Sequence, residues 1–366
     1  MREGWTYKKW SDVLSIINGK NQTTVECKDG KYPIYGSGGI MGHANDWLCP
    51  ENCVIIGRKG NINKPIFVTT KFWNVDTAFG LNANESSLLP KFLFYFCQDY
   101  NFERHNKAVT IPSLTKADLL KIDMPIPPLS EQQSIVVELD KINELISLKK
   151  AQLSDLDSLA QSIFYDMFGD LHNTAFSVQT LNDTCEFIKD GTHQTPQYTE
   201  DKINGVKFLS AKDVVSGYID WGNIKFIPYE LHSELHKRIA PKRGDILLCK
   251  NGTTGICAVV DTDDIFDIYV SLALLRPKTN NMPEYLHYAI NNPYTKQQFD
   301  DSLKGIGVPN LHLGEIKKTK IIIPPLSLQQ EFAKRIELIE QQKAQISSTI
   351  KDLETLLASR MQYWFD

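Results

Sequence analysis

One segment of this chain occurs twice. Residues 127 to 133 read Pro-Pro-Leu-Ser-Glu-Gln-Gln, and residues 324 to 330 read Pro-Pro-Leu-Ser-Leu-Gln-Gln, 197 positions later. The match extends without a gap over further positions on both sides, so that Pro112 falls on Pro309 and Phe168 on Phe365. An internal duplication of this length indicates that the chain builds one structural unit twice.

Each copy carries signals for the start of a helix. The paired prolines disfavour helical conformation in the residues before them, and Ser130 and Ser327 are of the type that caps the first N–H groups of a helix. Gln133 and Gln330 follow three residues later, where a capping box places Glu or Gln. The sequence therefore predicts two helices with serine N-caps, the first of which ends at Gly169, the residue type best suited to a left-handed C-cap.

Apolar residues in both helices follow the alternating four-and-three spacing of a coiled-coil seam. The seam positions of the first helix are Ile135, Leu139, Ile142, Ile146, Lys149, Leu153, Leu156, Ala160, Ile163 and Met167. Those of the second are Phe332, Ile336, Ile339, Lys343, Ile346, Ile350, Leu353, Leu357, Arg360 and Trp364. A helix from 130 to 168 would be roughly 57 Å long, and it needs a partner along its seam. We therefore expect the two helices to pair antiparallel; the alternative is two unrelated surface helices of one globule.

Composition indicates a multidomain protein with reduced thiols. The chain has 366 residues, enough for two or three domains, and seven scattered cysteines, which favour the cytosol over a disulfide framework. No apolar run approaches the ~18 residues of a membrane span, and residues 1 to 4 open no signal peptide. We therefore expect a cytoplasmic location. The net charge is −4; since the excess acid falls in the two predicted helices, it neither predicts nor excludes DNA binding.

Two β-rich blocks alternate with the helices. Strand-like segments such as Cys53–Ile56 in the first block and Gly244–Cys249 in the second are bounded by turn residues. Each block also contains an apolar segment preceded or opened by proline, Phe92–Cys97 and Pro283–Ile290, which we expect to be a buried helix. The order is globule, helix, globule, helix.

The predicted fold class is α+β, with two β-rich globular domains separated by two long helices that form an antiparallel coiled coil, and with a pseudo-twofold internal repeat. The predicted boundaries are a first globular domain at 1–126, a first helical spacer at 127–169, a second globular domain at 170–323 and a second helical spacer at 324–366.

Motifs of enzyme chemistry are incomplete. Residues 291 to 294 read Asn-Asn-Pro-Tyr and lack the second proline and the glycine-rich cofactor turn of adenine methyltransferases. His232 and His236 are four apart, but without the glutamate of a His-Glu-x-x-His motif. Cys49 and Cys53 lack a second pair for a zinc site, and Gly36–Gly39 is not followed by the Lys and Ser or Thr of a phosphate-binding loop. We therefore expect no catalytic residues, no cofactor and no metal.

The duplicated segments, together with Asp190-Gly-Thr-His193, Thr195-Pro-Gln-Tyr198 and Val308-Pro-Asn-Leu311, carry a resemblance over essentially the whole chain. In this order they resemble the DNA specificity subunit of type I restriction-modification systems. The resemblance implies two target recognition domains on an antiparallel coiled coil, each reading half of a split site in double-stranded DNA. It also implies two docked methyltransferase subunits and, for cleavage, restriction and motor subunits.

Two departures from that family leave alternatives open. The chain is short for the family, and Leu328 stands where the first copy has Glu131. Specificity subunits of type IIB-like enzymes share the layout and are one alternative; a coiled-coil adaptor without a role on DNA is another. Since the blocks have diverged while the helices have not, we expect the two half-sites to differ in sequence.

Sequence readout requires Arg, Lys, Asn or Gln at base edges and basic or small polar groups at phosphates. Loops that combine such residues with glycine give these DNA-binding candidates in the first block: Ser37, His43, Arg58, Lys59, Asn61, Asn63 and Lys64. The candidates in the second block are Lys189, Thr192, His193, Lys212, Lys250, Asn251 and Thr253. For each residue the alternative is an ordinary solvated turn.

The duplicated Pro-Pro-Leu-Ser segments and the outer faces of the helices are where the resemblance places methyltransferase subunits. The partner-binding candidates are Pro127, Pro128, Gln132, Gln133, Pro324, Pro325, Gln329 and Gln330. The alternative for these residues is a purely local role in capping and turn geometry.

Overall fold

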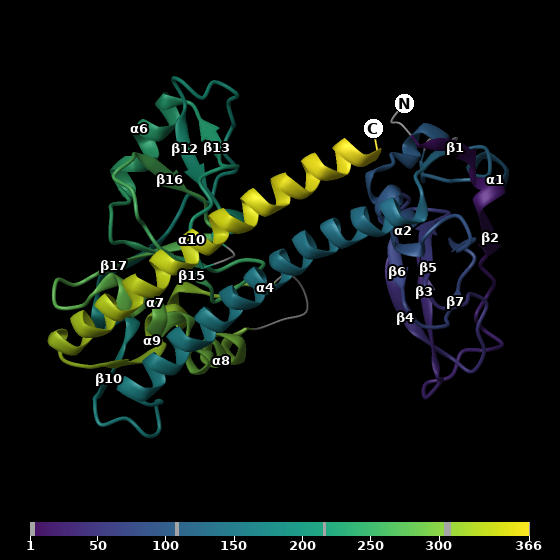
Figure 1. Ribbon diagram of the computed structural model, residues 1–366. Helices are drawn as coiled ribbons and strands as arrows, with labels where there is room; N and C mark the ends of the chain where they lie inside the picture. Colours follow the sequence, from purple (N-terminus) through teal and green to yellow (C-terminus); the bar gives the residue numbers. More distant parts are fainter. Residues whose placement is uncertain (1–3, 107–109, 215–216, 304–308, 366) are drawn as a thin grey trace. The chain divides into compact units, whose positions relative to one another are not determined.

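The computed structural model describes residues 4–106, 110–214, 217–303 and 309–365 (Figure 1). The chain divides into two compact units, one of Met1–Ala151 with Ile346–Asp366 and one of Gln152–Gln345. Each long helix, α4 (Leu129–Phe168) and α10 (Leu326–Phe365), contributes one half to each unit.

The first unit contains two small sheets and a two-stranded ribbon among the residues described. The larger sheet has the strand order β2 (Leu14–Asn18), β8 (Ala78–Ala83), β5 (Cys53–Gly57), β6 (Ile66–Val68). The smaller has the order β4 (Gly39–Ala44), β3 (Tyr32–Gly36), β7 (Trp73–Asn74), and the ribbon pairs β1 (Thr6–Lys9) with β9 (Asp123–Ile126). The short helices are α1 (Trp10–Val13), α2 (Pro90–Asp99), η1 (Phe102–His105) and α3 (Lys116–Leu119).

The second unit repeats this plan. Its larger sheet has the order β11 (Cys185–Asp190), β17 (Leu272–Pro277), β14 (Ile246–Cys249), β15 (Cys257–Val259). Its smaller sheet has the order β13 (Lys225–Ile227), β12 (Val206–Leu209), β16 (Phe266–Ile268), and its ribbon pairs β10 (Ser177–Thr180) with β18 (Lys320–Ile323). The helices are α5 (Leu181–Thr184), η2 (Ala211–Asp213), α6 (Tyr229–Arg238), α7 (Pro283–Asn291), α8 (Pro293–Ser302) and α9 (Leu313–Lys318).

The two units correspond strand for strand. In each small sheet the central strand pairs antiparallel with the next strand along the chain and parallel with a later one, β7 in the first unit and β16 in the second. The duplication therefore includes the globular blocks, where the sequence similarity was faint. Helices η2 and α6 have no counterpart among the described elements of the first unit, where η1 takes the place of α8 in the order of elements.

The long helices begin one residue earlier than predicted. Helix α4 starts at Leu129, and the Pro128 carbonyl accepts the first backbone hydrogen bonds, at 2.9 and 3.0 Å. Pro325 does the same for α10, at 2.9 and 3.2 Å. Ser130 and Ser327 thus lie inside the first turn, and the prediction of serine N-caps is wrong. The predicted end is confirmed, since α4 stops before Gly169, which has φ of 72°.

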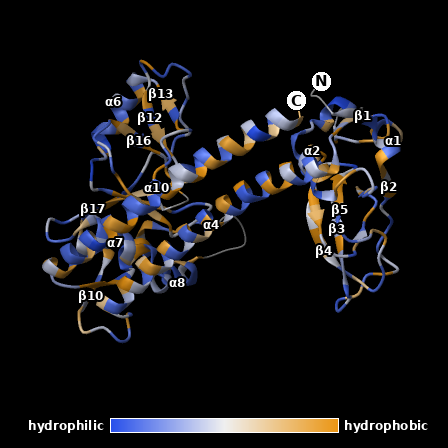
Figure 2. Cartoon of the chain, in the orientation of Figure 1, coloured by the Kyte–Doolittle hydropathy of each residue, from blue (hydrophilic) through white to orange (hydrophobic). Residues whose placement is uncertain are grey.

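The antiparallel coiled coil is confirmed within each unit. All twenty predicted seam positions are buried or half-buried. In the first unit Arg360 binds Glu138, and Lys150 lies 2.8 Å from Glu354; in the second unit Lys343 lies 2.8 Å from Asp157. As the position along α4 increases from Glu138 to Asp157, the paired position along α10 decreases from Arg360 to Lys343, as antiparallel pairing requires. Figure 2 shows hydrophobic positions recurring along both helices between hydrophilic ones.

Each helix end packs into the core of a globular block. Phe365 of α10 contacts Phe92 of α2, with ring centroids 5.2 Å apart. Its counterpart, Phe168 of α4, contacts Tyr285 of α7 at 5.1 Å. The ends of the long helices therefore pack against α2 and α7, the two apolar helices predicted from the sequence.

No helix among the described residues is long and apolar enough to cross a membrane. All seven cysteines are free thiols.

Candidate nucleic-acid interface

The basic loop that follows β5 in the first unit is fixed by backbone hydrogen bonds. Gly60 donates to the Pro112 carbonyl at 3.0 Å, and Leu114 donates to the Arg58 carbonyl at 2.9 Å. Gly60 has φ of 80°, a conformation that other residues adopt at a cost. The loop therefore presents Arg58 and Lys59 from a rigid backbone.

A second turn lies against this loop. It connects β3 to β4 and contains Ser37. A β-carbon placed on Gly60 would lie 3.8 Å from the Ser37 hydroxyl oxygen, so the turn and the loop are close neighbours. Asn61 lies beside the same turn, because a β-carbon placed on Gly38 would lie 3.5 Å from the Asn61 side-chain nitrogen. The structure thus brings together the predicted residues Ser37, Arg58, Lys59 and Asn61, of which Lys59 and Asn61 are exposed.

Other candidates of the first block lie apart from this cluster. His43 is exposed, but it pairs with Pro33 near the far end of the β3–β4 hairpin, about 13 Å along the strand from the turn. The Asn63 amide is used inside the chain, where it accepts from the Phe102 N–H at 2.8 Å. Lys64 is exposed.

The second unit contains the same loop arrangement. Gly252, with φ of 78°, donates to the Pro309 carbonyl at 3.0 Å, and Leu311 donates to the Lys250 carbonyl at 2.7 Å. Lys250 therefore corresponds to Arg58, and Asn251 to Lys59. Pro309, Asn310 and Leu311 belong to the motif quoted above, whose Val308 lies outside the described residues.

Lys250 is buried, unlike the expectation for a DNA-contacting lysine. Only 6% of it is exposed, and its ammonium nitrogen lies 3.3 Å from an Asp190 carboxylate oxygen. Lys250 thus holds the carboxylate around which the loops of this unit gather, and its direct contact with DNA remains a prediction.

Asp190 is the centre of that cluster. Its carboxylate also binds Arg238 at 2.8 Å and His193 at 2.9 Å, and Arg238 makes a second 2.8 Å bond to the Asp190 carbonyl. Burial would raise the pKa of Asp190, but the charge and hydrogen bond of Lys250 and the bond from His193 outweigh it, so the pKa lies below its ordinary value. The carboxylate stays ionised, and the exposed His193 and Arg238 are held at its rim.

Two further predicted residues flank the cluster. Thr192 is almost buried, and its backbone bonds to Ile268 and Val270. Lys212 is exposed and lies in η2. Ser271 connects η2 to Lys250, because the Ser271 carbonyl accepts from the Lys250 N–H and the Ser271 hydroxyl accepts from the Ala211 N–H, both at 2.9 Å.

Lys189 and Thr253 are exposed but are not part of the Asp190 cluster. Lys189 lies next to Asp190 in strand β11, so its side chain leaves the opposite face of the sheet. Thr253 follows Gly252 at the tip of the loop.

The predicted partner-binding residues divide by exposure in the same way in both copies. Pro127, Gln132, Pro324 and Gln329 are buried, whereas Pro128, Gln133, Pro325 and Gln330 are exposed.

The two buried glutamines bond within the chain. Gln132 accepts from Leu89 N–H at 2.8 Å and donates to the carbonyls of Ser87 and Pro127, both at 2.9 Å. Gln329 accepts from Met282 N–H at 2.9 Å and donates to the Pro324 carbonyl at 2.9 Å. These two side chains therefore attach each long helix to the start of α2 or α7, and partner contact would fall to the exposed residues of the segment.

Sequence reasoning did not select Asp190 or Arg238 as site residues. Asp190 was visible only as part of a quoted motif. Arg238 lies 48 residues further along the chain, in the last turn of α6, and no local pattern links the two.

Comparisons with known proteins agree with this geometry. The profile of the family described as "Type I restriction modification DNA specificity domain" matches residues 2–157 and 174–355. The chain belongs to this family of DNA specificity proteins.

Individual relatives are distant but similar over most of their length. The type I restriction enzyme MjaVIII specificity subunit of Methanocaldococcus jannaschii is 24% identical, covering 97% of this chain and 92% of the relative. The EcoBI specificity subunit of Escherichia coli is 22% identical, covering 92% and 79%. Among solved structures, the S subunit of a type I restriction-modification system from M. genitalium has a TM-score of 0.60 at 16% identity, covering 99% of this chain and 96% of that one. This last likeness supports the fold.

Proposed function

We propose that this chain is the non-catalytic DNA sequence-specificity subunit of a type I restriction-modification complex. Membership of the family is the observation that carries the proposal. The structure supports it with two globular blocks of one topology, each with a basic loop held at the same place by a Pro-x-Leu segment.

The two blocks act as target recognition domains with different specificities. The first presents Arg58 and Lys59, whereas the second presents Asn251, His193 and Arg238 beside its buried Lys250. Side chains that differ in hydrogen-bonding pattern read different base edges. The target is therefore an asymmetric, bipartite site in double-stranded DNA.

The long helices separate the two readers and set the length of the unread gap, because half-site spacing follows from the rigid element between reading domains. We place the recognition domains at 1–126 and 170–323 and the helical spacers at 127–169 and 324–366. The ribbons β1–β9 and β10–β18, which join the beginning and end of each domain, support these boundaries.

Two methyltransferase subunits dock on the exposed parts of the duplicated segment, namely Pro128 and Gln133 in one copy and Pro325 and Gln330 in the other. Since the copies are equivalent, one kind of subunit fits both. Restriction and motor subunits join this assembly for cleavage, and the complex works in the cytoplasm, where the chromosome lies.

The test uses the methyltransferase complex that contains this chain. Arg58→Ala should weaken binding to the target by about 1–3 kcal/mol and relax specificity at one base position. Lys59→Ala should weaken binding to all sequences alike and reduce the salt dependence by about one charge. Lys121→Ala, an exposed lysine of the first block outside the long helices and the candidate loops, is the control. Unchanged affinity of the Arg58 and Lys59 variants, with assembly intact, would remove this loop from the interface.

A further inference from the structure

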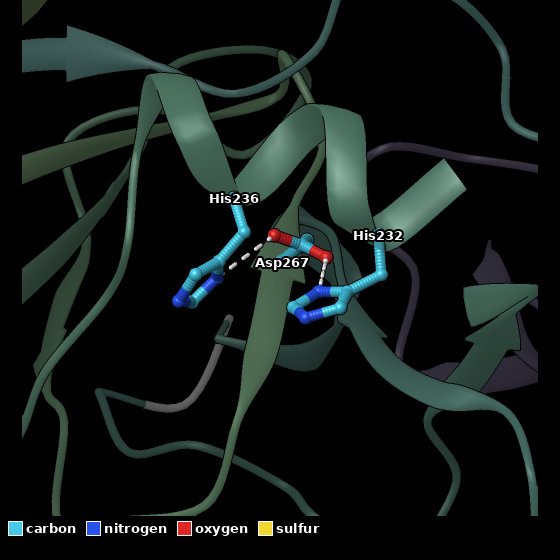
Figure 3. Close-up of side chains that lie close together, drawn as sticks. All are labelled: His232, His236 and Asp267. Atoms are coloured by element: carbon cyan, nitrogen blue, oxygen red, sulfur yellow. Dashed lines mark hydrogen bonds and ion pairs between the residues drawn. The ribbon is translucent and has the colours of Figure 1, made fainter. Parts of the chain in front are cut away.

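A buried cluster in the second unit is not used by the proposed DNA-reading loops. His232 and His236 lie one turn apart on α6, and Asp267 lies on β16 directly beneath them (Figure 3). The ligand atoms of the three side chains all lie within 4.8 Å of one another. Two imidazoles and a carboxylate at this spacing are a donor set that zinc and related ions bind.

We propose that His232, His236 and Asp267 form a binding site for one divalent transition-metal ion of the zinc class. The sequence alone argued against a metal, because the His-x-x-x-His spacing has no glutamate beside the first histidine. The fold supplies the third ligand from a strand 31 residues further on.

Of the two contacts with Asp267, one has the length of a hydrogen bond and the other has the separation of two ligands of one ion. His232 Nδ1 lies 2.7 Å from one Asp267 oxygen and is hydrogen-bonded to it. His236 Nδ1 lies 3.5 Å from the other oxygen. Ligands of a tetrahedral zinc site are separated by about 3.3 Å when each bond is about 2.0–2.1 Å long, so an ion fits between His236 and Asp267, and His232 need move only slightly.

The same contact leaves two polar atoms unsatisfied. His236 Nδ1 and Asp267 Oδ1 are buried and have no hydrogen-bond partner among the described residues. Asp267 is only 3% exposed. A buried carboxylate oxygen that makes an ion pair at 3.5 Å but no hydrogen bond with the described residues is costly, and a metal ion would satisfy it together with the histidine nitrogen.

The site would stabilise the DNA-reading side of the second domain. Arg238, two residues beyond His236 on the same helix, binds Asp190 at 2.8 Å. An ion that fastens α6 to β16 would therefore hold Arg238 in place at the candidate interface. This consequence rests on the proposed function, whereas the existence of the site does not.

The test is metal binding by the metal-stripped full-length chain. Titration with Co²⁺ should give d–d absorption bands that saturate at one ion per chain, without the charge-transfer band of thiolate ligands, and Zn²⁺ should displace the Co²⁺. Zn²⁺ should also raise the Tm of the wild-type chain.

His236→Ala is the decisive variant, since its side chain is one-third exposed and its loss should not unfold the domain. It should weaken binding at least about tenfold and abolish the Zn²⁺ effect on Tm. Asp267→Asn should do the same while keeping the shape of the side chain, and His172→Ala, an exposed histidine outside the cluster, should bind like wild type. Absence of stoichiometric binding, or equal binding by folded His236→Ala and wild type, would overturn the proposal whatever the DNA-binding result.

Discussion

At the scale of single residues, burial separates supporting roles from contact roles. Gln132 and Gln329 are of a type that sequence patterns assign to the surface, yet both have no exposed area. Lys250 is likewise buried, beside Asp190. The sequence identified the segments that contain these residues, but it could not predict which of their side chains face inward. That depends on segments distant in sequence that cover them, such as those at Leu89 and Met282 over the two glutamines.

Gln132→Ala should destabilise the first unit. The change leaves the Leu89 N–H and the Ser87 and Pro127 carbonyls without their partner in a buried site, which costs about 1–3 kcal/mol. Urea unfolding of the variant measures this, with Gln133→Ala as the exposed control. Equal stability of the two variants would show that the buried amide contributes nothing.

Asp190→Asn should lower stability at neutral pH, because it leaves the Lys250 ammonium buried without a carboxylate. Since the pKa of Asp190 is depressed in the folded chain, its contribution is present above the ordinary value of about 3.9 and is lost as the pH falls through the lower, folded value. The Tm difference between wild type and variant should therefore be constant from pH 7 to about pH 5 and shrink below about pH 4. A difference that grew on acidification would contradict this assignment.

At the scale of elements, periodicity decided what could be predicted. The two long helices and the buried strands β5 and β14 follow from local patterns and were found with nearly correct bounds. The parallel pairings of β3 with β7 and of β12 with β16 were not predicted. They join segments tens of residues apart and therefore leave no local signal in the sequence. The common position of the two basic loops also became visible only through their bonds to Pro112 and Pro309.

The left-handed glycines of these loops give an element-scale test. Gly252 has open space around its α-carbon, so Gly252→Ala adds only the cost of a positive φ, about 1 kcal/mol. The strained loop should bind DNA more weakly while the domain stays folded. Gly314→Ala, at an equally open position in α9 where φ is not positive, should leave the affinity unchanged. Loss of affinity in both variants would show that the loop geometry is not the cause.

The coiled-coil seam gives a second test. Ile146 is 7% exposed within the seam, whereas Leu148, on the same helix, is 58% exposed. Ile146→Ala should cost about 2–4 kcal/mol through the cavity it leaves, and Leu148→Ala should stay within about 0.5 kcal/mol. Thermal unfolding followed by circular dichroism compares them; equal losses would contradict the assigned seam.

At the scale of the whole molecule, the duplication would allow one chain to read an asymmetric sequence, as the proposed function requires. The two units share their topology strand for strand, and each long helix has one half in each unit. The shared parts are the attachment of helix to globule, through Gln132 and Gln329, and the positions of the basic loops. The divergent parts are the loop side chains, which under the proposed function give one architecture two specificities.

The most direct test of this account is to sequence modified bases in DNA from a host that carries this chain and its methyltransferase. We predict methylation in two half-sites of different sequence, separated by a gap of constant length in which any base is accepted. Exchange of the loop residues Arg58 and Lys59 should change one half-site and leave the other as it was. A single uninterrupted motif, or two identical half-sites, would contradict the account.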